Sequence, residues 1–82
     1  MPYASWFSDL FNAQLKALDK ERQMAVKKKI EQIIEMPDHY QFLHHTDRVQ
    51  KARIGKYRIF FRVTGNLIEF IEVRKRDIAY KR

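Results

Sequence analysis

The sequence contains no cysteine among its 82 residues. This absence excludes disulfide bonds, thiolate-ligated zinc and thiol catalysis, and it is typical of a reducing compartment. Long apolar runs are also missing, because Glu69 and Glu72 interrupt the most hydrophobic stretch. No segment approaches the ~20 apolar residues of a membrane-spanning helix, and no secretory signal is visible. We therefore expect a cytoplasmic protein that has no membrane partner.

Glycine and histidine are scarce. Gly55 and Gly65 are the two glycines, and both lie where hairpin turns are expected, so there is no phosphate-cradling loop. The histidines are His39, His44 and His45. Adjacent residues cannot both face one metal on a regular helix or strand, and no cysteine completes a ligand set. We expect neither a metal site nor a cofactor.

Residue pairs for acid–base or nucleophilic catalysis are missing as well. Glu69 and Glu72 stand three apart on a predicted strand, so we expect them on opposite faces of the sheet. Ser5 and Ser8 lie at the entry to a predicted helix rather than beside a base. Paired-carboxylate and serine-triad enzymes are therefore not indicated.

Positive charge is abundant, and it is concentrated in one part of the chain. The formal net charge is +7, with 17 Lys and Arg against 10 Asp and Glu. Residues 1–46 carry six basic and six acidic side chains, whereas residues 47–82 carry eleven basic and four acidic ones, and seven of those eleven are arginine. Because guanidinium groups match phosphate oxygens with paired hydrogen bonds, this segment predicts a phosphate-bearing partner.

Hydrophobic periodicity predicts one domain, residues 1–82, of the α+β class. Residues 3–7 are typical of a short strand. Ser8 and Asp19 are N-caps of two helices with apolar stripes, and the second helix ends at Met36-Pro37. Alternation then predicts strands at residues 49–54, 57–63 and 67–73, joined at Gly55-Lys56 and 64–66. We expect a helical hairpin packed on a small antiparallel β-sheet, followed by a short C-terminal tail from residue 74.

The same alternation assigns side chains to faces. Ile59 and Phe61 share one side of their strand with Tyr57 and Val63, and the other side carries Arg58, Phe60 and Arg62. On the preceding strand Lys51 and Arg53 oppose Ala52 and Ile54. The sequence therefore predicts a cationic sheet face opposite the helices.

A cluster of basic residues with one tyrosine is the candidate site. Such groups can hold a phosphodiester and neutralise the charge of its transition state, with a proton donor near the leaving oxygen. The candidate catalytic residues are Lys51, Arg53, Arg58, Arg76 and Tyr80. Further residues expected to contact RNA are Arg62, Arg74, Lys75, Lys56 and Lys81.

These segments resemble the RelE/ParE toxin superfamily. Residues 53–63, RIGKYRIFFRV, look like its core motif, and residues 73–80, VRKRDIAY, look like its closing element. The helical segments LKALD at 15–19 and IEQIIEMP at 30–37 are similar to its helical hairpin. The resemblance runs from about Phe7 to Tyr80.

The resemblance implies the toxin of a type II toxin–antitoxin system, bound by a cognate antitoxin, that cleaves mRNA on the ribosome and contacts rRNA there. It implies attack by the ribose 2′-hydroxyl on the neighbouring phosphate, giving 2′,3′-cyclic phosphate and 5′-hydroxyl ends without a metal. On the matching positions, Lys51, Arg53 and Arg58 would stabilise charge. Arg76 would assist the leaving group, and Tyr80 would stack or share in proton transfer.

Two alternatives stay open beside this endoribonuclease. ParE-type relatives have the same fold but poison DNA gyrase, and a catalytically inactive homologue would only bind RNA. Lys75 stands where many relatives carry histidine. The presence of Arg58, Arg76 and Tyr80 together favours the ribonuclease branch.

Overall fold

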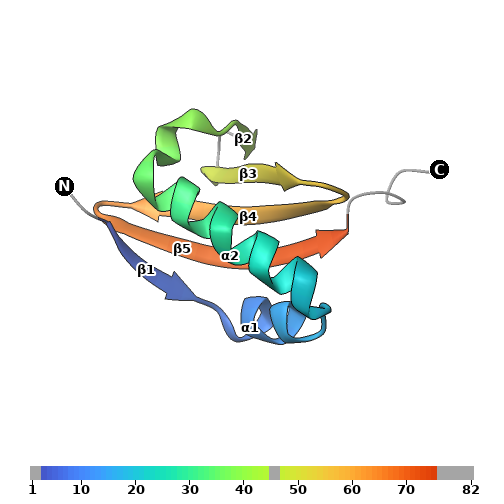
Figure 1. Cartoon of the computed structure of the whole chain (residues 1–82). Coiled ribbons are helices and arrows are strands. Elements are labelled where there is room, and N and C mark those ends of the chain that lie inside the picture. Colours follow the sequence, from blue (N-terminus) through green and yellow to red (C-terminus); the bar gives the residue numbers. More distant parts are fainter. Residues whose placement is uncertain (1–2, 45–46, 76–82) are drawn as a thin grey trace.

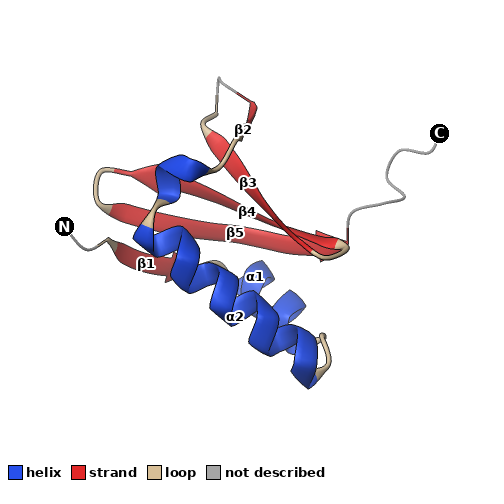
Figure 2. Ribbon diagram, turned by 45° about the horizontal axis from the view of Figure 1, so that its top comes forward, coloured by secondary structure: helices blue, strands red, loops and turns tan. Residues whose placement is uncertain are grey.

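The computed structural model describes residues 3–44 and 47–75. Five strands form one sheet in the order β1-β5-β4-β3-β2 (Figure 1), and both α-helices lie on the same side of it (Figure 2). The elements are β1 (Ala4–Phe7), α1 (Asp9–Lys16), α2 (Lys20–Glu35), the 3₁₀ helix η1 (Pro37–His39), β2 (Phe42–His44), β3 (Val49–Ile54), β4 (Tyr57–Thr64) and β5 (Leu67–Lys75). The predicted α+β arrangement of a helical hairpin on a sheet is confirmed.

Both helices begin at the predicted caps. The Phe11 N–H donates to Ser8 Oγ at 2.9 Å, and the Arg22 N–H donates to Asp19 Oδ1 at 2.9 Å. These bonds satisfy amide donors that have no partner inside the helix. Helix α2 ends at Glu35, just before Met36-Pro37, because the residue preceding proline is disfavoured in helical conformation.

The sheet is mixed rather than wholly antiparallel. Strands β2 to β5 pair antiparallel in sequence order, as expected for the meander, but β1 pairs parallel with β5. Strand β1 was predicted at residues 3–7, but its partner was not, because an apolar pattern carries no information on strand direction. Strand β2 was not predicted, since three residues are too few to show a period.

Strand β5 contains a bulge. Phe60 pairs with Glu72, while its neighbour Phe61 pairs with Phe70, so Ile71 has no partner on β4. An extra residue of this kind shifts the side-chain alternation by one position. Glu69 and Glu72 therefore share a face, and the prediction that they point to opposite faces was wrong.

The end of β5 also differs from expectation. We placed the start of the C-terminal tail at residue 74, but Arg74 and Lys75 continue the strand and pair with Arg58 and Tyr57. The β3–β4 turn is Gly55-Lys56 as predicted, and Gly55 has a φ of 61°. The positive φ explains the glycine at this tight hairpin turn.

The core lies between the helices and the sheet. It joins one side of α1 and α2 to the inward side of β3, β4 and β5. The members buried in this cluster are Phe11, Val26, Ile30, Ile33, Ala52, Ile59, Phe61, Ile68, Phe70 and Val73. Phe7 stacks on Phe70 with ring centroids 4.9 Å apart, which extends the core to β1. No helix among the described residues lies over the opposite face of the sheet (Figure 2).

Two polar side chains fasten α1 to the bulged part of β5. The Ser8 hydroxyl donates to the Ile71 carbonyl at 2.7 Å. The Val73 N–H donates to Gln14 Oε1 at 2.8 Å. Strand β1 pairs with β5 only as far as Phe70, so these two bonds supply partners that β1 does not offer to the following part of β5. Ser8 thus serves both as a helix cap and as an anchor of the bulge.

We expect Ser8→Ala to lower the free energy of unfolding by about 2 kcal/mol, because it removes a cap and leaves the Ile71 carbonyl without its partner. Asp19→Ala is the matched control, since Asp19 caps α2 and otherwise pairs only with exposed Arg22. It should cost about 1 kcal/mol. Urea unfolding measures both values. Equal losses would contradict an anchoring role for the Ser8 hydroxyl.

Candidate nucleic-acid interface

The sheet face opposite the helices carries the predicted cations. Strand register pairs Lys51 with Phe60 and Arg53 with Arg58, and Arg58 also pairs with Arg74 on β5. Paired residues point to the same face of a sheet, so Arg53, Arg58 and Arg74 form one row across three strands. The predicted cationic face is therefore present, with three arginines directly adjacent.

Carboxylates reach one part of this face. Arg62 Nε lies 3.3 Å from Glu69 Oε1, and Arg74 Nε lies 3.3 Å from Glu72 Oε2. The Arg74 guanidinium carbon also lies 5.4 Å from the centroid of the Phe60 ring, a cation–π contact. Two of the expected RNA contacts, Arg62 and Arg74, thus already have partners within the protein.

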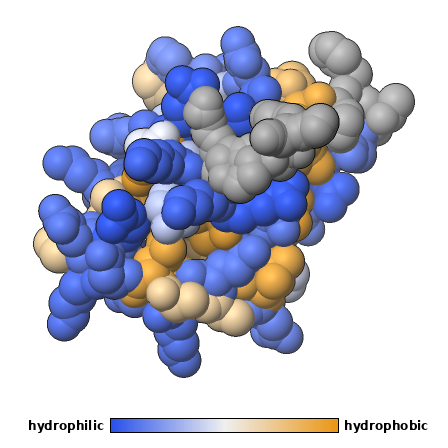
Figure 3. Space-filling view, turned by 90° about the vertical axis from the view of Figure 1, so that its right-hand side faces the viewer, coloured by the Kyte–Doolittle hydropathy of each residue, from blue (hydrophilic) through white to orange (hydrophobic). Residues whose placement is uncertain are grey.

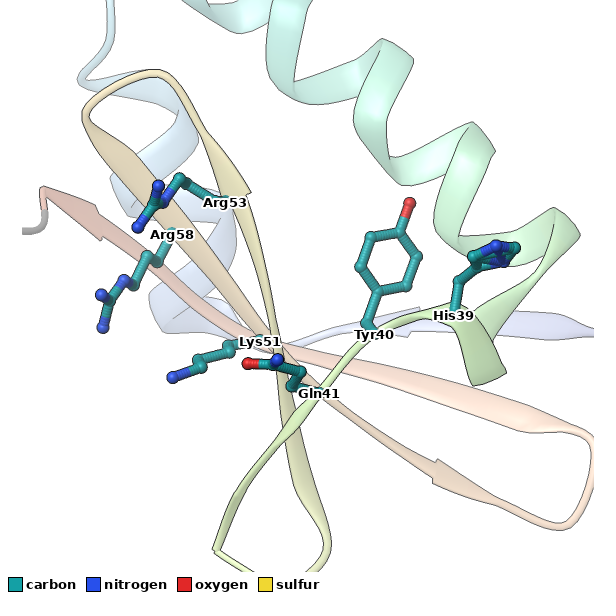
Figure 4. Close-up of a pocket in the computed structure, with 6 residues that line it drawn as sticks. All are labelled: His39, Tyr40, Gln41, Lys51, Arg53 and Arg58. Carbon is teal, nitrogen blue, oxygen red and sulfur yellow. The ribbon is translucent and has the colours of Figure 1, made fainter.

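Three cations have no such partner. Lys51, Arg53 and Arg58 form no ion pair with any residue in the described ranges 3–44 and 47–75. They line a hollow of about 330 Å³ together with His39, Tyr40 and Gln41. Figure 4 shows the Arg53 and Arg58 side chains next to each other, with Lys51 extending to the same side of the sheet. This arrangement concentrates uncompensated positive charge at one end of the face.

The other wall of the hollow is the segment between α2 and β2, which a buried glutamine holds in place. Gln50 is 4% exposed, and its Nε2 donates to the Pro37 carbonyl at 2.8 Å and to the Tyr40 carbonyl at 3.0 Å. The Lys51 N–H donates to the Gln41 carbonyl at 3.0 Å. The Tyr40 ring packs edge-on against Phe61 at 5.9 Å between centroids. The wall is thereby fixed to β3 and to the core.

The remaining expected RNA contacts lie elsewhere. Lys75 pairs with Tyr57 and so lies on the helix-covered side of the sheet, away from Arg74. Lys56 lines a different groove of about 320 Å³, between α2 and the β3–β4 turn. Figure 3 looks onto this end of the molecule, where hydrophilic surface surrounds smaller hydrophobic areas. Arg76, Tyr80 and Lys81 lie outside the described residues.

Sequence reasoning did not identify the wall formed by residues 37–41 as part of the site. Its one signal was Gln50, a polar residue at an inward position of β3, next to Ala52 and Ile54 on the same side. A buried amide needs partners, so this position pointed to a segment folded against the strand.

The described residues contain neither a metal-binding cluster nor a membrane-spanning helix. No group of three or more His, Asp or Glu side chains in the described part of the chain lies close enough to hold a metal ion. None of the helices described is long and apolar enough to cross a membrane.

A sequence profile for the ParE toxin of type II toxin–antitoxin systems (parDE) matches residues 7–80. The chain belongs to this toxin family. It is a type II toxin of the RelE/ParE superfamily, as the sequence motifs indicated. Comparison with curated proteins gives no sequence match to this toxin.

Solved RelE structures are similar to this RelE/ParE toxin. The isolated RelE toxin of E. coli superposes with a TM-score of 0.80 at 18% identity, over 93% of this chain and 86% of that one. A chain of the RelBE2 complex from Mycobacterium tuberculosis gives 0.79 at 20% identity, over 93% and 100%. A chain of the RelE–RelB complex from Pyrococcus horikoshii gives 0.77 at 19% identity, over 94% and 98%. At these identities the comparisons establish the fold.

We expect Arg53→Gln to raise the free energy of unfolding of the toxin by a few tenths of a kcal/mol, because it relieves repulsion from the directly opposite Arg58. Arg62→Gln is the control, since it removes an ion pair with Glu69 instead. Thermal unfolding at low ionic strength measures the difference. The gain should disappear in 1 M salt, where charges are screened beyond about 3 Å. Destabilisation by Arg53→Gln at low salt would contradict unrelieved repulsion.

Proposed function

We propose that this toxin is a metal-independent endoribonuclease that cleaves mRNA on the ribosome. The supporting observation is the convergence of Lys51, Arg53 and Arg58, all without ion-pair partners in the described ranges, on one hollow. Grouped like charges destabilise a sheet. A polyanion bound in the hollow offsets that repulsion, and an RNA phosphodiester is such a group.

The reaction is an in-line displacement at phosphorus. The ribose 2′-oxygen loses its proton and bonds to the phosphorus, the bond to the 5′-oxygen breaks, and that oxygen takes up a proton. The products are a 2′,3′-cyclic phosphate and a 5′-hydroxyl. Negative charge accumulates on the non-bridging oxygens in the transition state, and Lys51, Arg53 and Arg58 neutralise it there.

Two further roles rest on the sequence motifs. Arg76 assists departure of the 5′-oxygen, and Tyr80 stacks on a base or shares in proton transfer. Arginine remains protonated at neutral pH, so the contribution of Arg76 is electrostatic and through hydrogen bonds. The ribosome supplies an mRNA held in place, which the three cations of the hollow do not orient by themselves.

The partners follow from the same proposal. A cognate antitoxin binds the toxin in the cytoplasm and suppresses it until release. Leu10, Met24 and Met36 are half or more exposed along the helical hairpin, which suits an amphipathic antitoxin helix. Cations outside the hollow, such as Arg62 and Arg74, contact the RNA backbone or rRNA.

The alternative is a gyrase-poisoning toxin, which is favoured by the match to the ParE profile. Such a toxin damages DNA while messages stay intact, whereas the endoribonuclease removes messages without DNA damage. Primer extension on cellular mRNA, together with a reporter of the DNA-damage response, separates the two after induction of the toxin.

We expect Lys51→Ala and Arg58→Ala each to slow mRNA cleavage on ribosomes by about 100-fold or more, because each removes a preorganised charge from the transition state. Lys28→Ala is the control with the same charge change, on the exposed side of α2. It should cleave at the wild-type rate. Single-turnover assays with saturating ribosomes measure the effect. Normal cleavage by both hollow variants would refute the catalytic proposal.

Binding of single-stranded RNA should weaken with salt in proportion to the number of phosphates neutralised. For three contacts we expect a slope of log K against log salt of about −2, since each contact on a single strand contributes about −0.7. Fluorescence anisotropy with an uncleavable 2′-O-methyl oligonucleotide measures it. Arg58→Ala should reduce the slope by about 0.7. A slope near zero would contradict the proposal that these cations bind RNA phosphates.

A further inference from the structure

Gln41 contributes an uncharged amide to the cationic end of the hollow. Figure 4 shows its side chain extending beside that of Lys51, on the side of β3 where Arg53 and Arg58 lie. The remaining lining residues, His39 and Tyr40, point toward α2 instead. An amide carries both a donor and an acceptor, whereas lysine and arginine only donate. Gln41 therefore adds a hydrogen-bond acceptor, which the three cations lack.

The backbone of Gln41 is fixed, while its side chain is free. Its carbonyl accepts the Lys51 N–H at 3.0 Å, and the preceding residue, Tyr40, is held by the Gln50 amide at 3.0 Å. The Gln41 side chain is exposed and has no hydrogen bond to any residue in the described part of the chain. A polar group on a rigid support is positioned for a ligand.

Three other glutamines of the chain serve the fold. Gln14 accepts the Val73 N–H, Gln23 donates to the Leu18 carbonyl, and Gln50 donates to two carbonyls of the wall. Gln32 has a free side chain as well, but it lies on the exposed surface of α2 and lines none of the hollows described. The combination of a free amide with adjacent phosphate-binding cations is found at Gln41.

We propose that Gln41 reads the base of a nucleotide next to the phosphate held by Lys51, Arg53 and Arg58, and that it favours adenine. This inference rests on RNA as the substrate. Proteins read single-stranded RNA through the Watson–Crick and Hoogsteen edges of unstacked bases. Adenine presents an amino donor beside a ring-nitrogen acceptor on both of these edges.

Complementarity to an amide on the Hoogsteen edge selects adenine over the other bases. The Gln41 oxygen accepts from the adenine N6 amino group while its Nε2 donates to the adjacent ring nitrogen. Guanine presents two acceptors on its Hoogsteen edge, which suits the neighbouring cations rather than an amide. On the Watson–Crick edge guanine, uracil and cytosine also present a donor beside an acceptor, so the discrimination comes from the Hoogsteen edge, where adenine alone offers this pair to an amide. A bidentate pair of this kind contributes about tenfold in discrimination.

The test measures binding, so that its outcome does not depend on cleavage. The probes are fluorescent octanucleotides of 2′-O-methyl uridine in which one central position is adenosine, cytidine, guanosine or uridine. We expect the wild-type toxin to bind the adenosine probe about tenfold more tightly than the all-uridine probe. Gln41→Leu should reduce this ratio to less than about twofold, with unchanged affinity for all-uridine and an unchanged melting temperature.

Two control variants isolate the effect. Gln32→Leu removes the other free glutamine amide and should leave the adenosine preference at its wild-type value. Arg58→Ala should weaken all four probes by the same factor, because phosphate contacts carry no sequence information. When mRNA cleavage sites are mapped, the wild-type toxin should cut preferentially next to adenosine, and Gln41→Leu should cut without this preference.

The outcomes separate this inference from the proposed function. A wild-type toxin without base preference, or Gln41→Leu with the wild-type preference, would overturn base reading by Gln41 while leaving cleavage intact. Adenosine-selective binding without cleavage would support Gln41 and refute the endoribonuclease. If no probe binds, RNA is not the ligand of the hollow, and the inference that Gln41 reads a base is refuted as well.

Discussion

Burial of the inward side of the sheet is the constraint on which the cationic face depends. Ile59 and Phe61 are fully buried under the helices, and each such side chain contributes about 1.5–3 kcal/mol. Repulsion between Arg53 and Arg58, directly opposite on the other side, costs less than about 1 kcal/mol. Because neighbours in a strand point to opposite sides, the same packing that orders the core also fixes the arginines. The fold can therefore hold like charges together without carboxylates beside them.

The face is not uniform, and the bulge at Ile71 explains why. By shifting the alternation in β5, it brings Glu72 to the same side as Glu69, so that Arg74 and Arg62 each have a partner. Lys51, Arg53 and Arg58 form no ion pair with a carboxylate among the described residues. Charge is thus neutralised over β5 and left free in the hollow. A phosphate binds most favourably to cations that have no carboxylate partner in the protein. The proposed chemistry therefore lies on β3 and β4.

Period-two alternation was sufficient to predict the positions of the charges on β3 and β4. It placed Lys51, Arg53 and Arg58 on one face because both strands are regular and a two-residue turn at Gly55 sets their register. It failed on β5, where nothing in the sequence around Ile71 signals an extra residue. The bulge is fastened by contacts from α1, which lie far away in the chain and have no local signature.

The wall of the hollow was beyond sequence reasoning for a related reason. Residues 37–41 form a single 3₁₀ turn and an irregular connection, which have no hydrophobic period. Their position depends on Gln50, whose inward orientation was predictable but whose partners were not. The order of the chain suggested only that this segment connects α2 to the sheet.

Gln50 and Lys51 are neighbours on β3 whose side chains point to opposite sides of the sheet. The register of β3 therefore fixes both the wall of the hollow and the position of the lysine charge. Gln50 points inward and holds the wall, while Lys51 points outward into the hollow, and its N–H binds Gln41. A slip of one residue in β3 would bury the lysine and release the wall together. A buried amide that lost its partners would cost about 1–3 kcal/mol. The wall is therefore in place before any ligand arrives, so that RNA would meet a preorganised site rather than order one on binding.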